Sequence, residues 1–242
     1  MHSDETQLPL EANAILEFKA TKLRSESEAG VHLEGIDLRL RAGELALIEA
    51  RRGLADLLVP AASCGMLRPQ SGRVLYEGVD WSERSAANAV STRHGIGQVF
   101  EGTEWLSNLN VDENILLSAC HHTDRAEADL IAEAHAIAAR FGIQQLTSLR
   151  PNLVTPEELR VYAIVRAFLD TPKLVVLARP LRGVVRAYSG ALMDLVRESC
   201  QSGTAVLWIS SEQNILGSDQ LDPDCRHVIE PPHLRETQGA RS

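Results

Sequence analysis

The amino-acid sequence predicts an α/β fold, and three observations support this prediction. Residues 15–76 contain short runs in which apolar and polar residues alternate, as in strands with one buried face. Residues 102–170 place their apolar residues at helical spacing. Residues 173–229 alternate continuous apolar runs with a helical stretch, the pattern of a parallel sheet with crossover helices. We therefore expect an α/β core, a β-rich N-terminal part and a helical subdomain.

The β-rich part begins with the alternating run Ile15–Phe18. A second strand is predicted over residues 33–40, which place apolar side chains at alternate positions, and Ala42-Gly43 forms the turn after it. The apolar run Leu45–Ile48 follows as a third strand. The other elements predicted in this part are a turn at 68–72, a strand at 73–76, a polar helix at 82–91 and a strand in HGIGQVF.

The middle of the chain is expected to be helical. A short helix is predicted over Val111–Leu117, and a longer one over residues 124–142, closed by Gly142. Pro156, followed by two glutamates, starts a third helix, because proline and acidic residues suit the first helical turn. This helix should end near residues 170–172.

The last part returns to strands. Lys173–Leu177 and Thr204–Ile209 each contain a continuous apolar run, as in strands buried on both faces, and a helix over 191–200 separates them. A final strand is predicted at 226–229. The expected organisation is a flexible segment at 1–13, a core formed by 14–101 and 171–230, a helical subdomain at 102–170 and a flexible tail at 231–242.

Composition argues against several classes of protein. Acidic residues outnumber basic ones by 33 to 24, giving a net charge of −9, which disfavours nucleic acid as a partner. No window approaches the roughly 20 apolar residues of a membrane-spanning helix. The first residues lack the basic and apolar regions of a signal peptide. The four cysteines stand singly, as in reduced cytosolic proteins. We therefore expect a cytoplasmic protein.

Four passages, in order along the chain, resemble the ATP-binding subunit of an ABC transporter. They are LEGIDLRLRAGELALI before a Walker A loop, GMLRPQSGRVLYEGVDW after it, IGQVFEGTEWLSNLNVDENILL around a Q-loop, and PEELRVYAIVRAFLDTPKLVVLARPLRG from the signature helix into Walker B. The resemblance covers residues 15–230. It implies a RecA-like α/β core with an N-terminal antiparallel β-subdomain and an inserted helical subdomain. The passage from Gln98 to Leu117 most resembles the lipid-handling Mla/MCE group.

The chain departs from the family first at the Walker A loop. In that loop glycines let backbone N–H groups wrap the phosphates, a lysine neutralises their charge and a hydroxyl holds Mg²⁺. Glu44 and Gly65 anchor the same register, which retains Gly53 and puts Asp56 in place of the lysine. In this register, Ala50 and Ala55 stand at glycine positions, and Leu57 and Leu58 stand at the positions of the hydroxyl pair. The remaining positions of the loop are occupied by Arg51, Arg52, Gly53 and Asp56.

Among these changes, the replacement of the lysine by Asp56 most strongly disfavours the binding of a triphosphate. A unit charge at 4 Å contributes about 1 kcal/mol in water and about 4 kcal/mol at an effective dielectric near 20. Because Asp56 removes an attraction and adds a repulsion, the difference is roughly twice that. Arg51 and Arg52 either compensate part of this charge, or are solvated or paired with Asp56.

The other catalytic positions are changed as well. Ala178 stands at the Walker B acid and has no ligand atom, and Arg179 stands at the general-base glutamate, where a guanidinium cannot accept a proton. Glu101 stands at the Q-loop glutamine and Ser211 at the switch histidine, while the D-loop aspartate falls at Val185. The degenerate signature, with fewer N–H donors for a partner's nucleotide, is Leu153, Val154, Thr155, Pro156 and Glu157.

Asp56 and Arg179 have both changed sign relative to the family pattern. The resemblance places the Walker A lysine and the Walker B acids around one phosphate cavity. We therefore hypothesise a charge-swapped ion pair between Asp56 and Arg179 that fills the space of a phosphate. Side chains more than about 6 Å apart would contradict this pair.

Two other features call for an interpretation. His121-His122, with acids nearby, is interpreted as a solvated linker before a helix, because adjacent histidines point in different directions; no metal is expected. His94 and His227 are interpreted as lone surface or strand-end residues. Trp105 and Leu106 follow the Q-loop, where the family contacts the coupling helix of a permease. An exposed tryptophan suits such an interface, and a core role for Trp105 stays equally open.

Three functions stay open. The leading hypothesis is a catalytically inactive ATPase-like subunit without a cofactor, which supports or regulates an ABC transporter and pairs with a membrane permease and an intact ATPase subunit. Such a chain would lie on the cytoplasmic side of the membrane, with lipid as cargo under the Mla/MCE resemblance. The first alternative is a weak ATPase subunit that binds ATP and Mg²⁺ at a composite site. The second is a free-standing adaptor protein.

Overall fold

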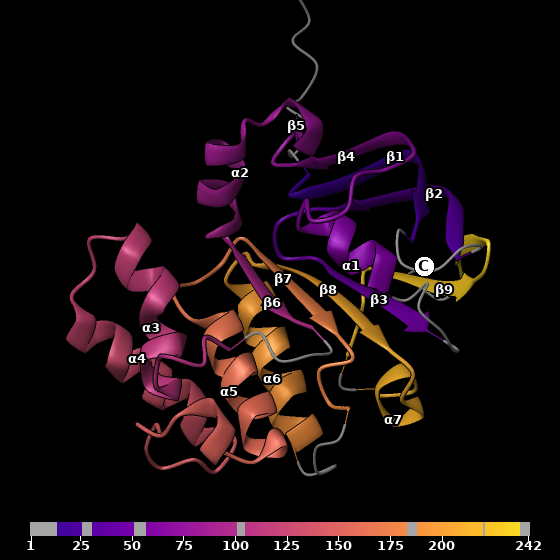
Figure 1. Ribbon diagram of the computed structural model, residues 1–242. Coiled ribbons are helices and arrows are strands. Elements are labelled where there is room, and N and C mark those ends of the chain that lie inside the picture. Colours follow the sequence, from indigo (N-terminus) through magenta and orange to yellow (C-terminus); the bar gives the residue numbers. More distant parts are fainter. Residues whose placement is uncertain are drawn as a thin grey trace, which may run out of the picture.

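The computed structural model describes residues 14–25, 31–50, 57–100, 105–182, 188–219 and 221–237. Their strands form one ten-stranded sheet, with helices packed on both faces of its parallel part (Figure 1). The strand order is β5-β4-β1-β2-β10-β9-β3-β8-β7-β6. The predicted α/β fold is therefore confirmed.

The parallel part of the sheet holds the buried apolar strands. β7 (Leu174–Ala178) and β8 (Ala205–Ser210) are buried at every position, as expected for strands covered on both faces. β3 (Leu45–Ala50) pairs in parallel with β8 on one side and with β9 (Cys225–Glu230) on the other. β6 (Ile96–Val99) pairs in parallel with β7 and completes this end of the sheet.

The N-terminal strands form the antiparallel part. β1 (Leu16–Arg24) pairs with β2 (His32–Leu40) and with β4 (Ser71–Tyr76), and β4 pairs with β5 (Val79–Asp80). Leu16 and Phe18 point into the core that this part shares with α1 (Leu58–Ser63). The alternation predicted for the first two strands is thus confirmed.

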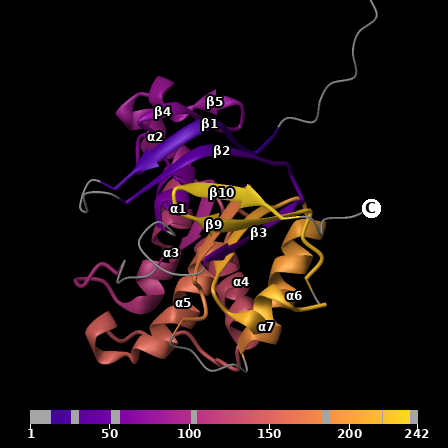
Figure 2. The ribbon, with the colours of Figure 1, turned by 90° about the vertical axis from the view of Figure 1, so that its right-hand side faces the viewer.

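The expected flexible tail at 231–242 is wrong for its first residues. His233–Glu236 form β10, which pairs antiparallel with β9 and in parallel with β2. Figure 2 shows β10 between those two strands, where it joins the antiparallel and parallel parts. Leu234 is buried in this junction. The short, mostly polar sequence carries no strand signal of its own, and one of its two partners, β2, comes from a distant part of the chain.

Three helices between β6 and β7 form the unit predicted as helical. They are α3 (Val111–His122), α4 (Glu127–Ala139) and α5 (Pro156–Phe168), which pack against one another in the larger hydrophobic core (Figure 1). Thr155 and Glu158 form a reciprocal capping box at the start of α5. The left-handed Gly142, with φ 78°, follows the end of α4 as expected.

The prediction for α3 is wrong in its length. The helix continues past Leu117 to His122, because Ala119 remains buried against the core and extends the apolar face by another turn. His121 and His122 therefore occupy the last turn of a helix and not a linker. The remaining helices are α2 (Ala86–Arg93), α6 (Tyr188–Gln201), α7 (Gln213–Leu216), and 3₁₀ turns at Trp81–Glu83 and Pro151–Leu153.

Candidate functional site

The carboxyl ends of β3, β8 and β7 meet at one edge of the sheet. Ile209 in β8 pairs with Ile48 in β3 and with Ala178 in β7. The residues that follow these strands therefore converge at this edge, where open α/β sheets bind their ligands. The structure thus places Ala50, Ala178, Arg179 and Ser211 at one edge of the sheet, at or directly after the ends of β3, β7 and β8.

The segment after β3 connects to a short helix. α1 spans Leu58–Ser63, and its N-cap Leu57 makes no side-chain capping bond. Leu58 is buried, and neither leucine offers a hydroxyl to an ion. The positions Arg51, Arg52, Gly53, Ala55 and Asp56 lie outside the described residues.

The end of β7 presents a methyl group and a cation where the family carries two carboxylates. Ala178 is 1% exposed. Arg179 has a left-handed backbone with φ 49°, and its N–H donates to the Ile209 carbonyl at 2.9 Å. Its carbonyl accepts from the N–H of Arg182 at 3.1 Å. Arg179 is therefore held in a tight turn against β8. The proposed pair with Asp56 stays a prediction, since Asp56 is not among the described residues.

The end of β8 carries one acid that the sequence interpretation missed. Ser211 is exposed, and the next residue, Glu212, is partly buried. The Glu212 N–H donates to Ser210 Oγ at 3.1 Å. Burial raises the pKa of the Glu212 carboxyl above its usual value. The sequence did contain a signal for Glu212, because this acid directly follows Ser211, which stands at the switch-histidine position.

The two residues at the end of β7 differ from the groups with which the family holds Mg-ATP. Mg²⁺ prefers oxygen ligands, usually one or two carboxylates together with phosphate oxygens. Directly after β7, the described side chains are a methyl group and a guanidinium. A guanidinium carries no acceptor and no removable proton at neutral pH. Neither metal binding nor general-base chemistry therefore follows from this strand end.

The signature segment presents apolar groups at the surface. Leu153 ends a 3₁₀ turn and is 64% exposed. The hydroxyl of Thr155 accepts from the Glu158 N–H at 3.2 Å and is thus occupied in capping α5. Pro156 has no N–H to offer. Val154 is partly buried and Glu157 lies in the first turn of α5. The Q-loop position Glu101 and the D-loop position Val185 lie outside the described residues.

Trp105 and Leu106 lie at the start of the helical unit and differ in exposure. Trp105 packs partly buried against the larger core, and the Arg166 guanidinium lies 4.7 Å from its ring centre. Leu106 is exposed, while its N–H donates to Asn114 Oδ1 at 2.8 Å. Trp105 is thus neither fully buried nor fully exposed, and the contact of Trp105 and Leu106 with a permease stays a prediction.

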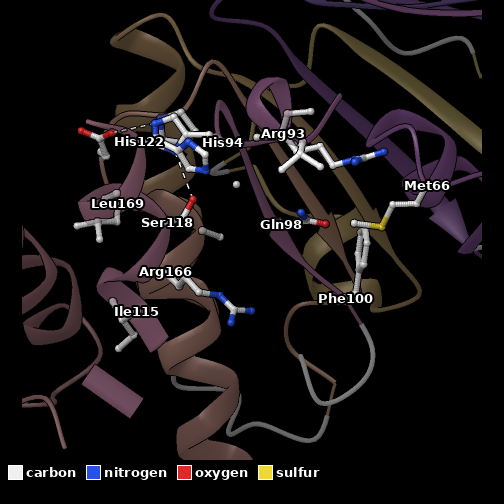
Figure 3. A pocket seen from close by; sticks show the side chains of 17 residues that line it. Met66, Arg93, His94, Gln98, Phe100, Ile115, Ser118, His122, Arg166 and Leu169 are labelled. Carbon is white, nitrogen blue, oxygen red and sulfur yellow. Dashed lines mark hydrogen bonds and ion pairs between the residues drawn. The ribbon is translucent and has the colours of Figure 1, made fainter. Parts of the chain in front are cut away.

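A cavity of about 500 Å³ lies beside these residues, and the sequence did not indicate it (Figure 3). β6 and the end of α2 line one side, and α3 and α5 line the other. Met66, Arg93, Gln98 and Arg166 are among its lining residues. Its walls come from segments far apart in the chain, so no local pattern marks it.

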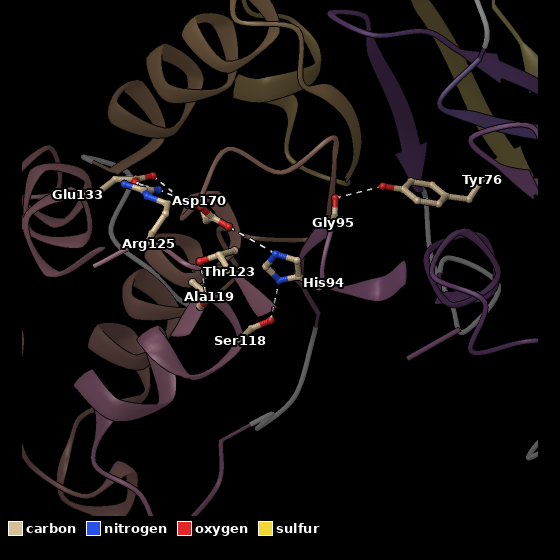
Figure 4. Close-up of polar contacts among 9 residues, drawn as sticks. All are labelled: Tyr76, His94, Gly95, Ser118, Ala119, Thr123, Arg125, Glu133 and Asp170. Atoms are coloured by element: carbon tan, nitrogen blue, oxygen red, sulfur yellow. Dashed lines mark hydrogen bonds and ion pairs between the residues drawn. The ribbon is translucent and has the colours of Figure 1, made fainter. Parts of the chain in front are cut away.

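His94 is not the lone surface residue that the sequence suggested. Its Nδ1 lies 3.3 Å from Ser118 Oγ, and its Nε2 lies 3.4 Å from Asp170 Oδ2 (Figure 4). Its ring centre lies 4.9 Å from that of His122. Burial first, and then His94 and His121, hold the pKa of His122 below its usual value. His227 is likewise no surface residue, since it is buried within β9.

Within the part of the chain that the structure describes, no group of three or more His, Cys, Asp or Glu side chains is arranged to hold a metal ion. His121 and His122 are exposed, and their rings meet edge to face with centres 4.9 Å apart.

Comparison with known proteins places the chain in a family. The sequence profile described as ABC transporter matches residues 33–181. The pyoverdine export ATP-binding/permease protein PvdT of Pseudomonas syringae pv. tomato is 28% identical over 76% of this chain, an alignment that spans only 28% of that relative's length. The putative hemin import ATP-binding protein HrtA of Staphylococcus epidermidis is 21% identical over 72% of this chain and 78% of its own.

The fold has close structural relatives. The dimeric post-hydrolysis structure of the ATP-binding cassette MJ0796, bound to ADP and phosphate, superposes with a TM-score of 0.81 at 16% identity, over 92% of this chain and 97% of that one. None of the helices among the described residues is long and apolar enough to cross a membrane. Profile and fold agree, and the chain belongs to the ABC transporter family, as an ATP-binding-cassette domain.

Proposed function

We propose that this chain is an ATPase-like subunit that supports or regulates an ABC transporter without hydrolysing ATP itself. The observation that carries the proposal is the end of β7, where Ala178 and Arg179 replace both family carboxylates at the edge where β3, β8 and β7 end together. A cassette that keeps its sheet and its helical unit keeps the shape that neighbouring subunits contact. Loss of the acids removes the chemistry and leaves that shape.

The proposed partners are a membrane permease and an intact ATPase subunit. Leu106 and the cavity between β6 and α3 offer an exposed surface near the start of the helical unit, which supports the permease contact. The exposed Leu153, at the start of the degenerate signature segment, supports contact with a different cassette subunit. Through the permease, the chain would lie on the cytoplasmic face of the membrane. A free-standing adaptor would need neither contact.

The cargo is left open in this proposal. The two relatives compared above are named for pyoverdine export and for putative hemin import. Neither name concerns lipids, so the Mla/MCE resemblance of residues 98–117 is the sole support for a lipid cargo. We propose lipid transport only as the cargo to be tested first.

A second candidate function rests on Glu212. Its partly buried carboxyl, with a raised pKa, follows β8 at the same edge as Arg179. A carboxyl group in this state is a candidate general base, and it would support weak hydrolysis at a composite site. Under this alternative, turnover by the assembled complex would fall when Glu212 is changed to glutamine. Under the first proposal it would not.

Thermal unfolding of the purified chain with and without Mg-ATP tests the first proposal. Ligand at a hundred times its Kd stabilises a folded protein by about 2.7 kcal/mol, which is a clear rise in Tm. We expect no rise for this chain at millimolar Mg-ATP. A clear rise in the isolated chain would contradict the proposal.

The matched control is the triple variant Asp56→Lys, Ala178→Asp, Arg179→Glu, which returns the family's charges to the site. A rise in Tm that appears in the triple variant alone assigns the loss of nucleotide binding to these three positions. An intact cassette subunit serves as the positive control in the same buffer.

A further inference from the structure

Two histidine rings meet where the helical unit adjoins the turn that leads into β6. His94, at the end of α2, and His122, in the last turn of α3, have ring centres 4.9 Å apart and ring planes tilted by 32°. His121 adds a third ring, with its centre 4.9 Å from that of His122. We call His94 and His122 the histidine pair; both rings lie on the same side of the cavity in Figure 3. The pair is thus a contact between α3 and the segment before β6.

His94 has a polar partner at each ring nitrogen. Asp170 Oδ2 lies 3.4 Å from Nε2, and Ser118 Oγ lies 3.3 Å from Nδ1 (Figure 4). A carboxylate accepts hydrogen bonds and donates none, so Asp170 selects the neutral tautomer in which Nε2 carries the proton. Nδ1 then accepts from the Ser118 hydroxyl, and once protonated it donates to the same oxygen. His94 can therefore take up a proton and keep both partners.

The surroundings of His122 disfavour a proton. Desolvation is the largest cause that holds the pKa of His122 below its ordinary value of 6.5, followed by the charges of His94 and then of His121. Within the described part of the chain, no carboxylate forms an ion pair with His122. A proton on this ring would therefore lie beside a second cation whenever His94 is also charged.

The other ionisable groups near the pair do not supply the missing negative charge. They are Arg93 from α2, Arg125 before α4, Glu133 from α4, Arg166 from α5 and Asp170 after α5. Arg125 already contacts both carboxylates, Glu133 at 2.7 Å and Asp170 at 2.9 Å. Lys173, whose N–H donates to the carbonyl of Gly95, pairs with Glu77. The environment therefore accommodates one proton on the pair more readily than two.

We propose that the histidine pair is a pH-sensitive contact, which holds one proton on His94 and opens when His122 takes up a second. The second proton puts cations on adjoining rings, and their repulsion separates the last turn of α3 from the end of α2. The helix α3 itself stays intact, because the negative end of its dipole favours a charged histidine in the last turn. Acidification therefore widens the cavity between β6 and α3, which both rings line. This inference goes beyond the proposed function and does not depend on it.

NMR of the full chain with ¹³C-labelled histidine rings tests the contact directly. At about pH 7.5 we expect a nuclear Overhauser effect between the ring protons of His94 and His122, because their ring centres are only 4.9 Å apart. At about pH 5 we expect this signal to be lost while the chain stays folded. A ring-to-ring signal that persists with both histidines protonated would overturn the proposal.

Two variants of His122 separate its charge from the general effect of acid. His122→Arg places a permanent cation beside His94, and His122→Gln places none. The reporter is the ¹³C-labelled methyl group of Ile115, which is buried on α3 and lines the same cavity. At about pH 7.5, His122→Arg should move this signal to its position in the native chain at about pH 5. His122→Gln should keep it at the neutral position at both pH values.

The matched control is His135→Gln, which changes a partly buried histidine of α4 and should leave the native pH response of the Ile115 signal unchanged. Thermal unfolding at about pH 7.5 is recorded for every variant, and His122 is exposed, so both of its variants are expected to fold. A folded His122→Arg chain with the neutral Ile115 signal would overturn the role of charge. So would a His122→Gln chain whose Ile115 signal still moves on acidification.

Discussion

His94 Nε2 lies 3.4 Å from Asp170 Oδ2, and this contact joins the end of α2 to the end of α5 (Figure 4). Asp170 also accepts from Arg125 at 2.9 Å, while its own N–H donates to Glu133 at 2.9 Å. One residue thus connects the turn before β6 with both α4 and α5. Both residues also line the cavity between β6 and α3.

Asp170→Asn tests the contribution of this junction to stability. Asp170 has a left-handed backbone with φ 64°, which asparagine also adopts, so the change removes the charge and keeps the turn. We expect the free energy of unfolding in urea to fall by about 1 kcal/mol. The control is Asp194→Asn, which breaks an exposed pair with Arg197 and should change stability by less than about 0.5 kcal/mol. Equal losses of unfolding free energy in the two variants would show that the contacts of Asp170 stabilise the fold no more than an exposed ion pair does.

The buried His227 predicts a loss of stability in mild acid. Burial holds the pKa of His227 below its usual value of 6.5, against a smaller opposite effect of Glu236. The unfolded chain therefore binds this proton more readily than the folded chain. This contribution to stability is present above the usual pKa and is lost as the pH falls through the lowered value.

Urea unfolding from about pH 8 to about pH 5 checks this expectation. The free energy of unfolding should decline with falling pH in the native chain and decline less in His227→Gln. His233→Gln changes an exposed histidine on the neighbouring β10 and should keep the native slope. A His227→Gln profile parallel to the native one would contradict the assignment.

A double-mutant cycle tests the proposed pair between Asp56 and Arg179. The single variants Asp56→Ala and Arg179→Ala and the double variant are compared by urea unfolding. A direct pair predicts a coupling free energy of about 1 kcal/mol or more, because either single change leaves the other charge without its partner. A coupling near zero would rule out the pair. Arg41 and Glu44, an exposed pair at 3.1 Å, provide the reference cycle.

Leu234→Ala tests whether β10 is a structural strand. Leu234 is 8% exposed where β10 joins β9 to β2. Removing its buried methyl groups is expected to cost about 2–3 kcal/mol of unfolding free energy. Leu106→Ala, at an exposed leucine, should change stability by less than about 0.5 kcal/mol. A loss of unfolding free energy in Leu234→Ala as small as that in the control would show that residues 233–236 do not stabilise the sheet.

The candidate site was predictable in part. The apolar run before Ala178 predicted that Ala178 and Arg179 stand at the end of a buried strand, and the structure has them at the end of β7. Glu212 was missed, since its burial depends on the packing around the end of β8. Gln98 was assigned to the strand β6, but its buried oxygen is visible only once α5 is packed against that strand.

The sequence by itself determined the elements whose signals are local. The uniform apolar runs of β7 and β8, and the Thr155–Glu158 capping box of α5, contain within a few residues what makes them strand or helix. Only the tertiary structure decided that β10 also pairs with β2 and that a cavity opens between β6 and α3. Both features depend on contacts between segments far apart in the chain, and the free energy of such contacts is absent from any local stretch of sequence.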